Sequence, residues 1–314
     1  MIFRRFPILF VLLFPLSVHG WGFFAHERIN RLAVFLLPPE MMVLYKPQLE
    51  YITAHATDAD KRRYILAEEG PRHYIDIDHY GTPPFDSLPR YWWAAVQKYS
   101  NDTLISYGVL PWHISIMMVR LTKAFEDRNI PQVLKLSADL GHYVADAHVP
   151  LHACSNHNGQ LTGQQGIHGL WESRIPELLA DQTFNYWAGN SVYIGDISAY
   201  AWEIITGSAM AADTVLQQER ELSQQFPPDQ RYAYENRKGK VVRTYADTYV
   251  KAYQQKLGNM VERRMCGAIH AVASFWYTAW VNAGMPPLGE FKGKILLNEV
   301  VLHTKDKIIG RGEE

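Results

Sequence analysis

The sequence has almost no net charge with which to attract a polyanion. Its 31 basic and 32 acidic residues give a formal charge of −1 with histidine neutral. Without a basic excess, the chain has no extended positive field that could hold a nucleic acid or an anionic lipid by charge alone. Bound metal ions would have to supply most of the positive charge for such a substrate. The composition, 47% hydrophobic and 13% aromatic, is that of a globular chain with a sizeable core.

Cysteine is nearly absent, since only Cys154 and Cys266 occur in 314 residues. These two thiols can form at most one disulfide in an oxidising compartment. Two buried thiols are an equally good interpretation, because the sequence does not show how far apart their Cα atoms lie.

No apolar run is long enough to cross a membrane. The run Ile8–Val18 follows two arginines, and Gly20 stands at the −1 position of an expected cleavage site. This run is well short of the roughly 20 residues that a membrane span needs. Residues 1–20 are therefore predicted to be a signal peptide that is removed before Trp21. The mature chain would be exported, periplasmic or extracellular, with no stable membrane anchor.

Neither a low-complexity linker nor a repeat of fixed period divides the chain. Apolar residues recur at helical spacing, and alternating strand patterns are scarce. The sequence thus predicts an all-α fold, a compact multi-helix single domain over residues 21–284. Helices are expected over residues 24–37, 112–125, 131–149, 168–179 and 197–226, and over 245–281 as one long helix or two stacked ones.

Two segments stand apart from this helical pattern. Residues 227–240 begin with two prolines and end in the run Arg237-Lys238-Gly239-Lys240, which predicts a loop or short hairpin with solvated charges. Residues 285–314 begin at a Pro-Pro break and mix apolar residues with charged ones. This C-terminal tail is assigned no role.

Two histidine–acid pairs at helical spacing give the first sign of chemistry. His142 and Asp146 lie four residues apart on an expected helix, so both side chains point to one face and can coordinate one metal ion. Taken alone, such a pair is more often an exposed hydrogen bond. The same spacing recurs at His168 and Glu172, and His152 lies between the two pairs. The repetition favours a metal site over two coincidences.

Further candidate ligands lie upstream. The motif His73-Tyr74-Ile75-Asp76 places an imidazole near carboxylates, and it can ligate a metal or form a polar turn. Asp58 and Asp60 precede this motif, and His26 lies on the first expected helix. By itself, a histidine on an apolar helix is typically a core residue with its hydrogen bonds satisfied.

Together these elements resemble the superfamily of zinc-dependent phospholipases C and single-strand nucleases of the S-one/P-one type. That family begins its mature chain with a tryptophan and a nearby histidine. An aspartate, a His-aromatic-x-Asp motif, a His-x3-Asp block ending in Pro-x-His, and a His-x3-Asp/Glu pair follow. The matching elements occur in this order from residue 21 to about 284: Trp21, His26, Asp58, His73 to Asp76, His142 to His152, and His168 with Glu172.

The resemblance implies three Zn²⁺ ions and a domain built around a trinuclear zinc cluster. Asp146 would bridge two ions, and the third ion would keep a position open for water or substrate, as catalytic zinc does. Asp58 and Asp146 are the expected catalytic carboxylates, Asp58 as a ligand or as a general base. The implied ligand sets are Trp21, His26 and Asp146 for the first ion; Asp58, His73, His142 and Asp146 for the second; and His152, His168 and Glu172 for the third.

The arginine that contacts the scissile phosphate in the nucleases has no direct counterpart here. The position three residues after Asp58 is Lys61, and Arg62 and Arg63 follow it. Either one of these arginines reaches the substrate, or Asp60 with Arg63 has taken the role. Asp58 is preferred as the ligand because its spacing to the His-aromatic motif resembles that of the nucleases.

The resemblance leaves three functions to compare. The favoured prediction is a secreted endonuclease or 3′-nucleotidase that acts on single-stranded nucleic acid or nucleotides and leaves 5′-phosphates. Tyr74 would stack on a base and Asp76 would bind its edge, although packing and turn capping explain these residues equally well. The alternative is a phospholipase C acting on phospholipid, for which Glu172 is the more typical acid. A zinc-binding protein without turnover is the third.

Overall fold

The computed structural model describes residues 22–237 and 239–289. The predicted signal peptide, Trp21 and most of the tail from 285 to 314 lie outside this part of the chain. Within it, the chain forms one mostly helical domain, as the helical spacing predicts. Not one of the described helices combines the length and the apolar character that a membrane span requires.

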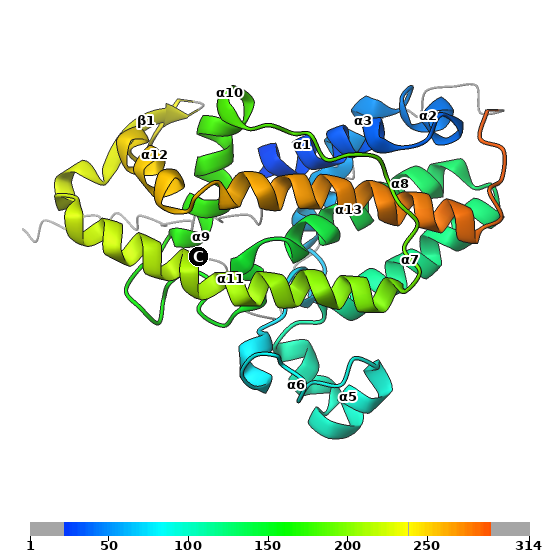
Figure 1. The fold of residues 1–314 in the computed structure, drawn as a ribbon, viewed down its shortest axis with the longest axis horizontal. Helices are drawn as coiled ribbons and strands as arrows, with labels where there is room; N and C mark the ends of the chain where they lie inside the picture. The colour runs from blue at the N-terminus through cyan, green and yellow to red at the C-terminus, as the bar shows by residue number, and fades with distance from the viewer. Residues whose placement is uncertain (1–21, 238, 290–314) are drawn as a thin grey trace, which may run out of the picture.

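Helix α8 (Ile130–Ala147) occupies the centre of this domain. Every residue from 137 to 147 is buried, and a helix buried on all sides is stable only inside a core. Helix α8 packs against α1 (Phe23–Ala33), α7 (Leu110–Glu126), α11 (Ile197–Gln225) and α13 (Met260–Asn282) (Figure 1). Because α8 carries several candidate ligands, this packing brings polar side chains into the interior of the molecule.

The sequence sets both ends of α8. At its start, the Asn129 side chain accepts a hydrogen bond from the Gln132 backbone N–H at 3.2 Å, and Pro131 lies in the first turn, where its missing N–H is not needed. After its end, Val149 is extended before Pro150, as the residue preceding proline prefers. The helix predicted over residues 131–149 is therefore confirmed to within two residues at each end.

Shorter elements complete the domain around these long helices. Helices α5 (Trp92–Tyr99) and α6 (Asn101–Ser106) project from its body (Figure 1). The other α-helices are α2 (Pro39–Tyr45), α3 (Leu49–Ala54), α4 (Asp58–Arg62), α9 (Ile167–Gly169), α10 (Asp181–Thr183) and α12 (Asp247–Lys256). Single turns of 3₁₀ helix are η1 (Val34–Leu36), η2 (His55–Thr57), η3 (Gly70–His73), η4 (Ile77–Tyr80), η5 (Pro150–Ala153) and η8 (Pro228–Gln230), and η6 (Leu170–Arg174) and η7 (Pro176–Ala180) are π-helical.

Two helical predictions needed refinement. The long pattern over residues 245–281 forms two helices, α12 and α13, because Gly258 and Asn259 both adopt positive φ angles between them. The helix predicted over residues 168–179 is present as one α-helical turn followed by the π-helical turns η6 and η7.

The polar segment after α11 forms a hairpin, one of the two structures predicted for it. Strands β1 (Tyr232–Arg237) and β2 (Lys240–Tyr245) pair antiparallel, with Tyr232 opposite Tyr245. They form the only sheet in the described residues. The second strand extends to residue 245, beyond the predicted segment and into the start of the predicted helix.

The two cysteines are thiols and are not joined by a disulfide. Cys154 is buried, whereas Cys266 is partly exposed and its Sγ donates a hydrogen bond to the backbone oxygen of Asn185 at 3.1 Å. Of the two interpretations that the sequence allowed, the structure therefore has the thiols, although only one of them is buried.

Close packing of α8 against α1 gives a first prediction. A Cβ on Gly141 would lie 2.8 Å from Cγ of Asn30, whose amide donates to the backbone oxygen of Ala138 at 3.1 Å. Gly141→Ala should therefore destabilise the protein by about 1–3 kcal/mol, the usual cost of overpacking.

Gly207→Ala on α11 is the matched control, because its Cβ would meet nothing closer than 3.6 Å. It should stabilise the protein by about 0.5–1 kcal/mol, since alanine favours a helix interior over glycine. Urea unfolding of both variants checks this pair, and equal destabilisation would contradict it.

Candidate metal centre

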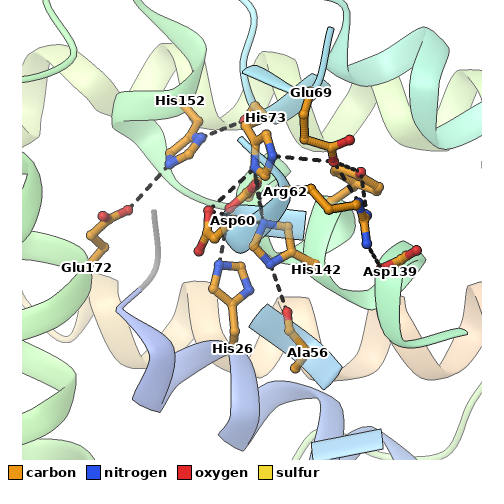
Figure 2. Close-up of polar contacts among 12 residues, drawn as sticks. His26, Ala56, Asp60, Arg62, Glu69, His73, Asp139, His142, His152 and Glu172 are labelled. Carbon is orange, nitrogen blue, oxygen red and sulfur yellow. Dashed lines mark hydrogen bonds and ion pairs between the residues drawn. The ribbon is translucent and has the colours of Figure 1, made fainter. Parts of the chain in front are cut away.

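Eight buried imidazole and carboxylate side chains converge on the middle of the domain from α1, α4, η3, α8, η5, α9 and η6. Figure 2 shows most of them pointing toward one another around His73. They form three groups, in each of which the candidate ligand atoms lie within 4.8 Å of one another. The groups are His26, His142 and Asp146; Asp60, His73 and His142; and His152, His168 and Glu172.

Asp146 lies between the first two groups. Its Oδ1 is 3.3 Å from Nε2 of His26. Its Oδ2 is 2.9 Å from Nδ1 of His73 and 3.2 Å from Nε2 of His142. The two oxygens of one carboxylate thus face different histidines, which is the arrangement expected of a carboxylate that bridges two metal ions.

The aspartate that lies in the second group is Asp60, and not Asp58, which the sequence analysis preferred. Oδ1 of Asp60 lies 3.7 Å from Nδ1 of His73 and 3.6 Å from Nε2 of His142. The Asp58 carboxylate instead contacts the His55 ring and accepts from Nζ of Lys61 at 2.9 Å. The two aspartates are two residues apart on α4, and side chains at that spacing point to different sides of a helix.

The third group combines a short 3₁₀ turn with the start of the π-helical segment. Nε2 of His152 lies 3.4 Å from Oε2 of Glu172, and Nε2 of His168 lies 2.9 Å from the same oxygen. π-Helical turns are rare and occur frequently at functional sites. Although the helix is π-helical here, Glu172, the fourth residue after His168, still lies beside His168. The pair predicted from the sequence is therefore in contact.

Backbone carbonyls fix which nitrogen of two histidines faces the centre. A carbonyl oxygen can only accept, so Nδ1 of His142 donates to Ala56 O at 2.8 Å, and Nδ1 of His152 donates to His73 O at 2.6 Å. In the neutral ring, as in a metal-bound one, Nε2 then carries the lone pair and faces its group. Contacts of this kind set the tautomer and orientation of metal-binding histidines.

Glu69 supports His73 from the opposite side and was not singled out in the sequence. Its Oε1 lies 3.7 Å from Nε2 of His73, and its Oε2 accepts from Nη1 of Arg72 at 2.7 Å. The Tyr143 hydroxyl donates to the same carboxylate, and Arg62 lies 3.4 Å from it. Burial raises the pKa of Glu69, but His73, Arg62 and Tyr143 outweigh burial and hold it well below its usual value. The four-residue spacing from Glu69 to His73 was the available signal.

The charges of the groups respond strongly to burial and to one another. Burial, with the neighbouring His142, lowers the pKa of His26 to about 4. Burial also acts against protonation of His142, but the carboxylates of Asp146 and Asp60 raise its pKa to about 9. Asp146 is held ionised, because the effect of His142 and of the other nearby histidines exceeds that of burial.

The residues present fit a bound metal. Both ring nitrogens of His26, both oxygens of Asp60 and Nε2 of His152 are buried without a hydrogen-bond partner among the described residues. Buried polar atoms in proteins nearly always have partners, so several such atoms at one point indicate a missing ligand. Nitrogen of histidine and oxygen of carboxylates is a donor set that zinc accepts. Trp21, which the resemblance adds to this set, lies outside the described residues, although Gly22 N donates to Glu172 O at 3.2 Å.

The structure does not place the predicted substrate residues as expected. Tyr74 is fully buried and its hydroxyl donates to the Ser106 carbonyl at 3.2 Å, so its ring is not available for stacking on a base. Asp76 is also buried, with 6% of its surface exposed. Arg62 is held by Asp139 at 2.9 Å in the Glu69 network, and Arg63 belongs to none of the three groups. The burial of Tyr74 and the pairing of Arg62 with Asp139 therefore count against the role of substrate contact predicted for each.

A cavity of about 450 Å³ lies between the third group's helical segment and the hairpin. Gly169 and Ser173 line it, each next in sequence to a residue of the third group. Arg174 of η6 and two arginines of the hairpin, Arg237 and Arg243, also line it. Of these, Arg237 belongs to the run whose charges were expected to be merely solvated.

Two of the three arginines are already paired. Arg174 contacts Asp247 at 2.7 Å, and Arg237 contacts Glu177 at 3.2 Å. The Arg243 guanidinium lies 4.2 Å from the centre of the Tyr232 ring and has no carboxylate partner among the described residues. Arg243 is therefore the cation of this cavity that is available to an anion.

The fold, but not the sequence, is similar to known proteins. No family model matches the chain, and none of the curated proteins compared with it does. A crystal structure of Clostridium perfringens alpha-toxin from avian strain SWCP is 12% identical, with a TM-score of 0.50, over 83% of this chain and 64% of the toxin. The alpha-toxin of Clostridium absonum is 11% identical, with a TM-score of 0.47 over the same shares. This chain thus spans less than two thirds of the toxin chains. The likeness to the first toxin defines the class of fold.

The position of Asp60 gives a second prediction. Asp60→Asn should weaken zinc binding at least about tenfold, since even residues that only support a ligand cost 10–100-fold. Asp58→Asn is the control two residues away, and it should bind zinc as the unchanged protein does. Competition with a chromophoric chelator measures both affinities. Equal zinc affinities for the two variants would show that Asp60 is not a ligand.

Proposed function

We propose that the chain is a zinc-dependent phosphodiester hydrolase, and that it cleaves phospholipids in the manner of a phospholipase C. The observation that carries this proposal is the central carboxylate of Asp146, which faces two groups of histidines at 2.9–3.3 Å in a fully buried site. Two adjacent metal sites sharing one carboxylate are typical of enzymes that transfer or hydrolyse phosphoryl groups.

The described residues would hold three zinc ions in the sets that the geometry brings together. The sets follow the resemblance, with Asp60 in place of Asp58, and Trp21 remains a proposed ligand of the first ion. Zinc bound there would supply positive charge to a phosphoryl oxygen and lower the pKa of water. Asp58 is no longer proposed as a general base, because His55 and Lys61 already hold its carboxylate.

The chain's own residues orient these groups and receive the substrate. Glu69 holds one side of the His73 ring, so that its Nδ1 stays directed at Asp146. The candidate ligands are buried, and the lower dielectric around them strengthens the electrostatic interactions among them. We propose that the anionic part of the substrate enters along the cavity beside the third group, where Arg243 neutralises its charge.

Two observations favour a phospholipid over a single-stranded nucleic acid. The proposed base-stacking residue, Tyr74, has no exposed surface, and this removes the main argument for the nuclease. Glu172 in the third group is the acid more typical of the phospholipases within the superfamily that the sequence resembles. The similarity of the fold to that of an alpha-toxin agrees with a resemblance to the phospholipases of this superfamily.

The proposal predicts a clear order of substrates. Zinc-loaded protein should hydrolyse phosphatidylcholine to diacylglycerol and phosphocholine, and should cleave single-stranded DNA and RNA far more slowly. Asp146→Asn, matched in helicity, is the inactive control, because it removes the shared carboxylate. Cleavage of nucleic acid alone would restore the nuclease alternative. No turnover of either substrate, with zinc bound, would leave a non-catalytic zinc protein.

Arg243 gives a further prediction on the same enzyme. Arg243→Gln should raise KM for an anionic phosphodiester by about tenfold, the size expected for one lost charge-assisted hydrogen bond. The kcat should change little, because Arg243 is not in the three groups. Lys240→Gln on the same hairpin is the control, since Lys240 does not line the cavity. A matching rise in KM for both variants would indicate only a general loss of positive charge.

A further inference from the structure

A second cavity, of about 710 Å³, lies away from the three groups, between α5, η3 and α7. Its walls are largely aromatic and aliphatic, with Trp92, Trp112, Ile105, Val109 and Ile116 among the lining residues. A cavity of this size lies in the usual range for small-molecule sites, roughly 300–1,000 Å³. Such sites combine apolar walls with a few polar groups that orient the ligand.

The polar groups of this pocket gather around His113. Its ring is buried, with 6% exposed, and its Nε2 has no hydrogen-bond partner among the described residues. Burial lowers the pKa of His113 to about 3, and the charges of Arg72 and Arg120 add to this effect. The imidazole is therefore neutral and lies close to two guanidinium groups, all three of which line the pocket.

The positive charge of this cluster is only partly compensated. Arg72 is paired with Glu69 at 2.7 Å. Arg120 has no hydrogen bond or ion pair among the described residues and is exposed on α7. Arg90, a third lining arginine, packs its guanidinium over the Trp202 ring at 4.6 Å. Glu68, the carboxylate among the lining residues, offsets a second of the three arginine charges. One positive charge is left over, so a mainly apolar ligand with one negative group complements the pocket.

Aromatic rings that pack edge to face provide the surface for an apolar chain. Trp92 and Trp112 meet edge to face at 5.3 Å, and Trp112 meets Trp202 in the same way at 5.1 Å. The Trp112 Nε1 already donates to the Arg90 carbonyl at 2.8 Å, so its ring presents only apolar surface to the pocket. Rings fixed in this way bind an apolar ligand without losing side-chain freedom.

We propose that this pocket binds a single-chain anionic amphiphile, a free long-chain carboxylate. Its chain lies against Trp92 and Trp112, and its carboxylate meets Arg120. This site is separate from the metal centre, and it does not depend on the hydrolase function proposed above.

Tryptophan fluorescence measures this binding directly, because two tryptophans line the pocket. Dodecanoate, titrated below its critical micelle concentration into the full chain, should change the emission in a saturable manner with one site per chain. Dodecanol, which has the same chain and no charge, should bind at least about tenfold more weakly, since it lacks the charge-assisted hydrogen bonds. Equal affinities for the two compounds would overturn the proposal. A response to phosphatidylglycerol vesicles without one to dodecanoate would also overturn it, in favour of a membrane surface.

Two pairs of variants locate the site. Arg120→Gln should weaken dodecanoate binding about tenfold and leave dodecanol binding unchanged, whereas Arg220→Gln, an exposed arginine on α11, should alter neither. Ser115→Phe fills the pocket and should abolish both, whereas Val119→Phe, on the same helix but outside the pocket, should not. Circular dichroism confirms that each variant is folded. Dodecanoate binding that survives both Arg120→Gln and Ser115→Phe would place the ligand elsewhere. The readout needs neither zinc nor turnover, so its failure leaves the proposed hydrolase untouched.

Discussion

The buried carboxylate of Asp146 is the constraint on which the rest of the structure depends. A carboxylate without solvent contact is stable only if positive charge or hydrogen-bond donors surround it. Here the histidines around it, led by His142, outweigh burial and keep its pKa far below the usual range. The chain must therefore bring His26 and His73 to Asp146 on α8 from two other elements, α1 and η3. This explains why the fully buried part of α8, residues 137–147, carries polar residues.

A second buried carboxylate, Glu69, links the metal groups to the rest of the molecule. It is the common partner of His73, Arg62, Arg72 and Tyr143, and so it explains why the Arg62 guanidinium is part of the buried framework. Arg72 also lines the apolar pocket beside α7. Arg72, Glu69 and His73 thus connect the pocket to the metal centre through two successive contacts.

Much of the fold could be predicted from the sequence, because the long helices bury a continuous apolar face. Helices α7, α8 and α11 begin and end within about two residues of their predicted limits, inside the usual uncertainty of helix ends. The short helices between residues 39 and 106 were not predicted. A helix of six or seven residues is too short to be stable by itself, so its formation depends on tertiary packing. The break between α12 and α13 likewise became clear only from the positive φ angles of Gly258 and Asn259 in the structure.

The sequence by itself determined the ligand types and their local spacing. Residues four apart lie about one helical turn apart, so His142 meets Asp146 and His168 meets Glu172 whatever surrounds them. Only the tertiary structure decided which of the two neighbouring aspartates lies beside His73 and His142. Helix α4 packs against α8 so that Asp60 points inward, whereas Asp58 contacts His55 and Lys61. That choice depends on contacts between residues far apart in the chain, and these contacts leave no trace in local spacing.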